Sequence, residues 1–278
     1  MTIPPSPPAP VPSPPTLERT GQPNPAWQWL VPTLYIALTV AALWWALSGV
    51  ELTSAILANG FMQLRFILKE MVGNPNWEIL PKVLKGLKES LQIAAVGTVM
   101  AAILAIPFGA LAARNLSRLP VLPAIGKFLL NLIRAFPELI LAIAFISALG
   151  PGAFAGVLAV GIHSIGMMGK LYGERIETVD KGAVEALSAT GASPADIFRH
   201  AILPEVLPDF LSLTLYRFDL NVRAATVLGL VGAGGIGTLL DLQLKGGNWD
   251  AIGVILLGTI LTIGLIDYIS AKLRAKLA

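Results

Sequence analysis

Residues 185–204 read Glu185-Ala-Leu-Ser-Ala-Thr-Gly191-Ala-Ser-Pro-Ala-Asp-Ile-Phe-Arg-His-Ala-Ile-Leu203-Pro204, a polar stretch between long apolar runs. The segment from Asp180 to Thr190 is rich in helix-forming residues. Gly191 follows it, and glycine most readily adopts the left-handed conformation that closes a helix. The pattern predicts a short helix that ends at Gly191.

A second short helix should begin directly after this break. Ser193 is a favourable N-cap, Pro194 suits the first helical position, and Asp196 can reach back as in a capping box. Pro204 marks the next boundary. The stretch therefore predicts two short helices at an angle, a geometry that suits a docking element. An ordinary amphipathic helix pair between apolar segments is the alternative interpretation.

The composition is typical of an integral membrane protein. The 278 residues are 55% hydrophobic and 13% charged, whereas soluble domains carry about 25% charged residues. The chain has no cysteine and two widely separated histidines, which excludes disulfides, cysteine nucleophiles and a clustered metal site. The net charge of +3 suits loops that face anionic lipid and does not indicate nucleic-acid binding.

The N-terminal part differs from the rest of the chain. Residues 1–26 hold ten of the 21 prolines, so we expect a disordered, Pro-rich cytoplasmic tail, with a proline-rich ligand for a partner as the alternative. A signal peptide is excluded because the apolar run begins only at Trp27. Residues 27–48 carry tryptophans at both ends and are long enough for a first transmembrane helix. Residues 49–88 are expected to form an extracytoplasmic loop with an amphipathic surface helix at 61–71.

Residues 89–278 form the predicted core domain, which includes the polar helices at 180–204. Its apolar runs are long enough for five more membrane spans; these are Ser90–Ala113, Leu122–Leu149, Ala153–Tyr172, Pro208–Leu230 and Ala251–Ile269. The predicted fold class is all-α, a polytopic transmembrane helical bundle of six spans. Pro107 and Pro137 should kink the spans that contain them.

Charged residues fall inside the predicted third and fifth spans, where a charge is costly and rarely without purpose. In the fifth span, Asp219 and Arg223 are four residues apart, so they share a helix face and can pair, whereas Arg217 points elsewhere. In the third span, Arg134 and Glu138 are again four apart. The sequence therefore predicts two ion pairs and one unpaired arginine.

These five residues carry a net charge of +1, which suits a pathway for an anion. We assign the five residues to such a pathway together with Asn221 and His163. Structural ion pairs that lock helices together are an equal alternative. For His163, a hydrogen-bonded helix contact is the other interpretation.

The motif Gly232-Ala-Gly234-Gly-Ile-Gly237 matches the dinucleotide pattern G-x-G-x-x-G, and the match is rejected. No strand precedes it and no ribose-binding acid lies about 20 residues on. Small residues at the exit of the fifth span, which let helices approach closely, explain it better. The chain also has no GxxxxGK[ST] phosphate loop, so it should not hydrolyse ATP. An intramembrane enzyme or scaffold remains a hypothesis without paired carboxylates or a Ser/Lys dyad to support it.

The polar stretch resembles the cytoplasmic signature of importer-type ABC transporter permeases: Glu-Ala-Ala, three residues, Gly, nine residues, then Ile-x-Leu-Pro. Two positions depart from that signature. Leu187 replaces its third-position alanine, and Ala201 stands where it has isoleucine, with Ile202 one residue late. Neither change is polar. The resemblance implies that the loop inserts into a cleft on an ATPase subunit, and it assigns this coupling role to Glu185, Ala186, Leu187, Gly191, Ile202, Leu203 and Pro204.

The resemblance narrows to the phosphonate/phosphite ABC transporter permease family, which residues Phe136–Leu141, His163–Tyr172 and Leu215–Gly237 look like. It implies the type I importer permease fold, which the methionine-uptake permeases share more distantly. It also implies a homodimer with two ATP-binding subunits and an extracytoplasmic substrate-binding protein, with lipid around it. ATP and Mg would be bound by the partner ATPase, and no cofactor is expected in this chain. A permease for an amino acid such as methionine, or for another oxyanion, is the alternative.

Orientation follows from the basic residues. With the coupling loop in the cytoplasm, six spans put both termini there too. The loops on that side and the C-terminal tail carry ten Lys and Arg residues and the opposite side carries six, five of them between Arg65 and Lys88. The positive-inside rule is therefore weakly met. The expected location is the bacterial inner membrane, with several passes.

Overall fold

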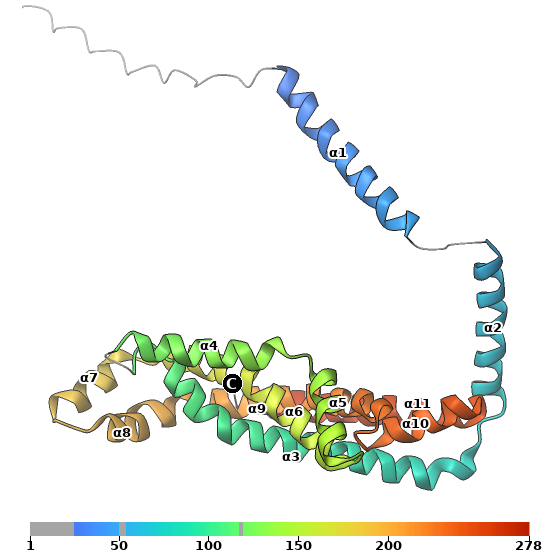
Figure 1. The fold of residues 1–278 in the computed structure, drawn as a ribbon. Helices are drawn as coiled ribbons and strands as arrows, with labels where there is room; N and C mark the ends of the chain where they lie inside the picture. The colour runs from blue at the N-terminus through green and yellow to red at the C-terminus, as the bar shows by residue number, and fades with distance from the viewer. Residues whose placement is uncertain (1–24, 50–53, 117–118, 278) are drawn as a thin grey trace, which may run out of the picture. The chain divides into compact units, whose positions relative to one another are not determined.

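The computed structural model describes residues 25–49, 54–116 and 119–277, and these residues form helices joined by short turns, with no strand among them (Figure 1). The fold class predicted from the sequence is confirmed as all-α. The chain divides into two units, residues 1–63 and residues 64–278, each described by itself. Residues 1–24 of the expected tail lie outside the described residues.

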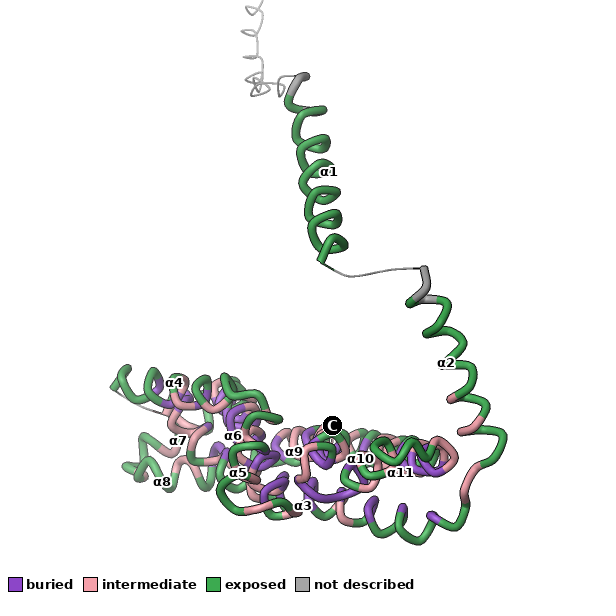
Figure 2. Tube along the Cα trace, turned by 45° about the vertical axis from the view of Figure 1, so that its right-hand side comes forward, coloured by how far each residue is buried: buried purple, intermediate pink, exposed green. Residues whose placement is uncertain are grey.

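The N-terminal unit contains α1 (Pro25–Ser48) and the first half of α2 (Ser54–Gly73). The described side chains of α1 are exposed along the helix, as Figure 2 shows. An apolar helix of 24 residues with no buried face is what a lipid-facing segment requires, because lipid and not protein then covers its side chains.

The second unit holds the remaining helices. In chain order they are the 3-10 turn Trp77–Ile79, α3 (Leu80–Ala112), α4 (Val121–Ala135), α5 (Glu138–Leu149), α6 (Ala153–Glu177), α7 (Lys181–Ala189), α8 (Pro194–Ile197), the π-helical turn Phe198–Ile202, α9 (Leu203–Leu228), the 3-10 turn Gly229–Val231, α10 (Ile236–Gly246) and α11 (Trp249–Arg274).

Four helical segments of the described chain are long and apolar enough to cross a membrane. They are Trp29–Ser48 in α1, Trp77–Ala112, α6 and α11. Two bent helix pairs raise the number to six if each pair is one span: α4 with α5, bent by 77°, and the helices from Pro194 to Val231 with α10, bent by 42°. The chain is thus a helical membrane protein with four to six candidate spans, and the six-span arrangement stays a prediction.

The third predicted span, Leu122–Leu149, is not one continuous helix. Phe136 has extended backbone angles, φ −82° and ψ 119°, between α4 and α5. Pro137 explains the break, because proline has no N–H to donate and disfavours the helical conformation in the residue before it. The sequence predicted a kink at Pro137, and the structure has a complete interruption.

The glycine-rich segment after α9 is followed by a helix that the sequence analysis missed. Gly232, Gly234 and Gly235 have φ values of +96°, +82° and +75°, which turn the chain sharply before α10 begins. The Ser90 hydroxyl of α3 accepts a hydrogen bond from the Ile236 N–H at 2.9 Å. This contact caps the start of α10 from a distant part of the chain.

The core of the second unit lies along α3, α6 and α9, where Figure 2 shows buried residues gathered. Close packing of α3 on α6 depends on small residues. A Cβ on Gly109 would lie 3.0 Å from the carbonyl oxygen of Gly169, and a Cβ on Gly173 would lie 3.0 Å from that of Gly109. In lipid, such close backbone approach supplies the van der Waals packing that holds helices together.

An aromatic pair joins α6 to α9. The rings of Tyr172 and Phe210 stack with centroids 3.8 Å apart and an interplanar angle of 10°. The Tyr172 hydroxyl also donates to the Phe210 carbonyl oxygen at 3.3 Å and lies 2.7 Å from the Thr214 hydroxyl. Because α6 enters the α7–α8 segment and α9 leaves it, the two helices form an antiparallel pair closed by that segment.

Candidate functional sites

The polar stretch folds as two short helices, as local sequence rules predict. Asp180 caps α7, and its carboxylate accepts from the Gly182 N–H at 3.1 Å. At the other end, the Gly191 N–H donates to the Ser188 carbonyl oxygen at 3.1 Å, and Gly191 has a φ of +78°. The prediction that Gly191 closes the first short helix in the left-handed conformation is therefore confirmed.

The cap of the second helix is also confirmed. The Ser193 hydroxyl accepts from the Asp196 N–H at 3.2 Å and donates to the Asp196 carboxylate at 2.6 Å. Pro194 occupies the first helical position of α8. The capping interaction is reciprocal, because the Ser193 hydroxyl bonds both the backbone N–H and the side chain of Asp196.

Residues assigned to coupling divide into an exposed group and a supporting group. Glu185, Ala186, Gly191 and Pro204 are exposed, and Leu187 and Leu203 are half-buried. Ile202 is only 1% exposed and belongs to the core cluster that Tyr172 and Phe210 also join. Ile202 therefore anchors the segment to the bundle and offers no contact surface of its own.

Three polar contacts hold this segment at the end of the second unit, where α7 and α8 lie in Figure 1. The Asp180 N–H donates to the Glu205 carboxylate at 3.2 Å, which joins the start of α7 to the start of α9. The Glu177 carboxylate at the end of α6 accepts from the Arg114 N–H at 2.9 Å and pairs with Lys127 at 3.0 Å. The bend is thus exposed while both of its ends are fixed.

A buried polar network lies between α3, α6 and α9. Asn221 is 0% exposed; its side-chain NH2 donates to the Thr98 hydroxyl at 2.8 Å and to the Ser164 hydroxyl at 3.1 Å. The Ser164 oxygen also accepts from Arg217 Nε at 2.9 Å. The sequence singled out Asn221 and Arg217; it gave no signal for Thr98 and Ser164, which are distant in the chain.

Arg217 has no carboxylate partner in the part of the chain that the structure describes. It is 6% exposed, and besides Ser164 it contacts the sulfur of Met167 through Nη1 at 3.2 Å. A thioether is a weak acceptor that cannot neutralise a cation. The expectation that Arg217 is separate from the Asp219–Arg223 pair agrees with this geometry.

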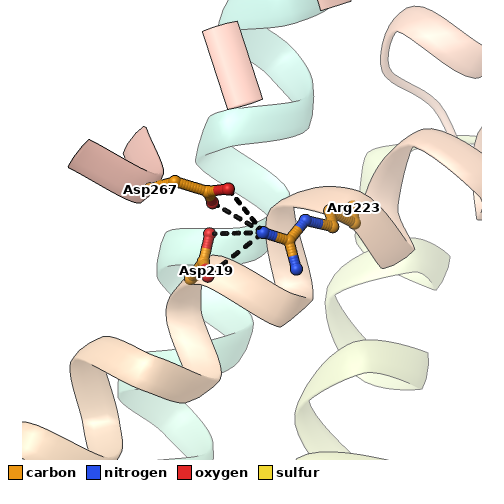
Figure 3. A network of polar contacts seen from close by, with 3 residues as sticks. All are labelled: Asp219, Arg223 and Asp267. Atoms are coloured by element: carbon orange, nitrogen blue, oxygen red, sulfur yellow. Dashed lines mark hydrogen bonds and ion pairs between the residues drawn. The ribbon is translucent and has the colours of Figure 1, made fainter. Parts of the chain in front are cut away.

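The pair predicted between Asp219 and Arg223 is present, and a third residue joins it. Arg223 Nη2 lies 3.4 Å from Asp219 and 2.7 Å from both carboxylate oxygens of Asp267 on α11, as Figure 3 shows. Asp267 was missed because it is 44 residues away in sequence. With Asp267 included, the set holds three acidic and three basic residues, so the net charge of +1 predicted for the original five disappears. An anion pathway must then depend on where single charges lie.

Arg134 and Glu138 do not form the predicted helical pair. The four-residue spacing places two side chains on one face only within a continuous helix, and the break at Phe136 and Pro137 separates these two. No ion pair joins them among the described residues, and Glu138 Oε1 is buried without a hydrogen-bond partner there. The Arg134 side chain instead lies over α6, with its Cγ 2.7 Å from where a Cβ on Gly166 would be.

His163 makes the kind of contact that the alternative interpretation described. Its Nδ1 lies 3.3 Å from the Phe136 carbonyl oxygen; because a carbonyl only accepts, this ring nitrogen carries the proton and donates. The bond satisfies a carbonyl that the break in the helix leaves free. No group of three or more potential metal ligands occurs in the described ranges.

The chain is similar in sequence to known transport proteins. Residues 105–275 match the family of binding-protein-dependent transport system inner membrane components. The phosphite transport system permease protein PtxC of Stutzerimonas stutzeri is 38% identical over 223 residues, 80% of this chain and 81% of that protein. The phosphate-import permease protein PhnE of Mycolicibacterium smegmatis is 39% identical over 178 residues, 64% of this chain and 34% of that protein.

A solved structure shares the fold. An inward-facing structure of the MetNI methionine ABC transporter matches 73% of this chain and 99% of its own, with a TM-score of 0.62 and 20% sequence identity. At this identity the match supports the helical permease architecture and carries no information on substrate.

Proposed function

Because this chain belongs to the family of binding-protein-dependent transport system inner membrane components and is the permease component of an ABC importer, we propose that it moves phosphite or a phosphonate across the bacterial inner membrane. Two identical copies would form the pathway. Two ATP-binding subunits would supply ATP hydrolysis, and an extracytoplasmic binding protein would deliver the substrate. ATP and Mg belong to the partner subunits in this scheme.

The substrate assignment rests on the relatives. PtxC is named as a phosphite permease and spans most of this chain at 38% identity. The similarity of MetNI is limited to the fold, so a methionine-type substrate has weaker support. Phosphate is the second candidate because PhnE of Mycolicibacterium smegmatis is named as a phosphate-import permease.

The coupling proposal rests on the exposed bend at Gly191. The first of its two helices, α7, presents Glu185 and Ala186 outward, while the buried Ile202 and the Asp180–Glu205 contact hold the segment to α9. A docking element needs this combination of an accessible surface and fixed ends, because a loosely attached loop would absorb a displacement without passing it on. We therefore assign the ATPase contact to this bend and place it, with both termini, in the cytoplasm.

Reconstitution tests the proposal. The chain would be co-expressed with its ATPase and binding protein, purified and placed in proteoliposomes, and ATP-dependent uptake of phosphite, methylphosphonate, phosphate and methionine would be measured. We expect uptake of phosphite or methylphosphonate, and none when ATP is replaced by a non-hydrolysable analogue. Uptake of methionine alone would contradict the substrate assignment, and uptake independent of ATP would contradict the importer mechanism.

A further inference from the structure

Three segments of the second unit meet on one turn of α6, residues 163–167. The Phe136 carbonyl at the helix break accepts from His163. The Arg134 side chain lies over Gly166. Arg217 of α9 contacts Ser164 and Met167. The turn therefore collects two arginines and a histidine beside an interrupted helix.

Arg217 is held in place but not neutralised. Its Nε is fixed by Ser164, which Asn221 and Thr98 support through the buried network. Its Nη1 meets only a sulfur atom, and no hydrogen bond joins its Nη2 to another described residue. A buried guanidinium without a counter-ion is unfavourable. Its geometry favours contact with the oxygens of a carboxylate or phosphate-type anion.

Glu138 supplies a hydrogen-bond acceptor at the break between α4 and α5. Its Oε1 is buried and has no hydrogen-bond partner among the described residues. It follows Phe136 by two residues, and the Phe136 carbonyl contacts His163 on the α6 turn that also holds Arg217. A buried carboxylate oxygen in this state is an acceptor that lacks a donor. Arg217 of α9 thus places a cation near the α4–α5 break, and Glu138 of α5 places a hydrogen-bond acceptor without a donor there.

We infer that the α4–α5 break and the α6 turn 163–167 bind a tetrahedral phosphorus oxyanion that keeps one proton. Arg217 contacts an ionised oxygen, and Glu138 accepts the hydrogen bond of the P–OH group. The site rests on the proposed function and deepens it by defining the protonation state of the substrate. Sulfate has the same shape but carries no proton at neutral pH, so one of its oxygens would face the Glu138 carboxylate without a donor between them.

Direct binding to the permease tests this inference, because uptake alone also reflects the choice made by the binding protein. The permease–ATPase complex in lipid nanodiscs, without binding protein, would be titrated calorimetrically with methylphosphonate, phosphite and sulfate at pH 6.5, a condition chosen to keep much of the phosphorus oxyanion singly protonated. We expect binding of the first two, with sulfate at least about ten-fold weaker, since hydrogen bonds to charged groups contribute roughly 1.5–3 kcal/mol.

Substitutions at two positions, Glu138 and Arg217, separate the role of the hydrogen-bond acceptor from that of the cation. Glu138→Gln should strengthen sulfate binding and reduce the discrimination, because the amide can donate to a sulfate oxygen; a merely structural residue would not give this gain. Arg217→Gln should weaken all three ligands about ten- to hundred-fold, and Arg217→Lys, which keeps the charge, should retain part of the affinity if Arg217→Gln fails to fold. Glu174→Gln is the matched control, since Glu174 is an exposed carboxylate of α6 in a surface pair with Lys170 and should change nothing.

Three results would overturn the inference: equal affinity of the wild-type complex for sulfate and methylphosphonate, no measurable binding of either phosphorus oxyanion, or unchanged discrimination in Glu138→Gln. The proposed function is tested separately by uptake into proteoliposomes. If the wild-type importer takes up no phosphorus oxyanion, the function is wrong. If it does so while Glu138→Gln shows wild-type discrimination, only the binding site is wrong.

Discussion

Substitution of Gly191 isolates the energetic role of the coupling bend. Gly191 has a φ of +78°, and a Cβ added there would meet nothing within 4 Å. A side chain at this position therefore costs backbone strain and no steric clash. For alanine the left-handed conformation costs roughly 1–2 kcal/mol. A strain of this size reduces the population of the native bend about 5- to 30-fold relative to competing loop conformations.

The size of the effect should follow the side chain. Asparagine tolerates the left-handed region, alanine less, and the β-branched valine least. We expect Gly191→Asn, Gly191→Ala and Gly191→Val to lower the number of substrate molecules imported per ATP hydrolysed in that order, with valine nearly uncoupled. The yield of membrane-inserted chain should stay normal, because the exposed bend lies outside the core.

Gly182→Ala is the control for this series. Gly182 lies in the same segment without a positive φ, and a Cβ there would make an ordinary contact at 3.4 Å with Asp180. It should therefore transport like wild type. A Gly191→Val variant with the wild-type ratio of import to ATP hydrolysis would refute the reasoning, and so would a Gly182→Ala variant that is equally uncoupled.

Three further predictions concern contacts and topology. Glu185→Lys should reduce co-purification of the ATPase, because its exposed charge would face the partner; unchanged co-purification would remove Glu185 from the docking surface. In this naturally cysteine-free chain, a cysteine at Asn74 should react with an impermeant maleimide from outside intact cells and one at Lys181 should not, and the reverse labelling would invert the proposed orientation. Arg223→Gln should lower the yield of folded complex by leaving two carboxylates without their cation, a loss of about 3–5 kcal/mol for a fully buried pair and less here because Arg223 is 43% exposed. Adding Asp267→Asn should restore part of that yield, and a double variant no better than Arg223→Gln would show that the cluster does not stabilise the fold.

The features that local sequence predicts are those set by neighbouring residues. The Gly191 turn and the Ser193 cap depend on residues within four positions, so backbone propensity and side-chain reach suffice to place them. The Asp219–Arg223 contact also follows from helical spacing. Each of these was found in the structure.

The features that the sequence missed depend on distant residues or on a break in a helix. Asp267 meets Arg223 across two helices, and Ser164 reaches Arg217 from a third; spacing along the chain holds no information on either. The failed pair of Arg134 and Glu138 is different, since Pro137 between them was visible. A spacing of four residues places two side chains on one face only where the helix is continuous, and Pro137 interrupts it.

The antiparallel pair of α6 and α9 has a mechanical consequence. Glu177 at the base of the coupling segment and Ser164 beside Arg217 are 13 residues apart on α6, about 20 Å along a helix. The stacked Tyr172 and Phe210 join the two helices between these points, so bending one would separate the rings. A force applied at the bend should therefore move α6 and α9 together as a rigid body. The Ser164–Arg217 contact would move with the two helices and keep its length.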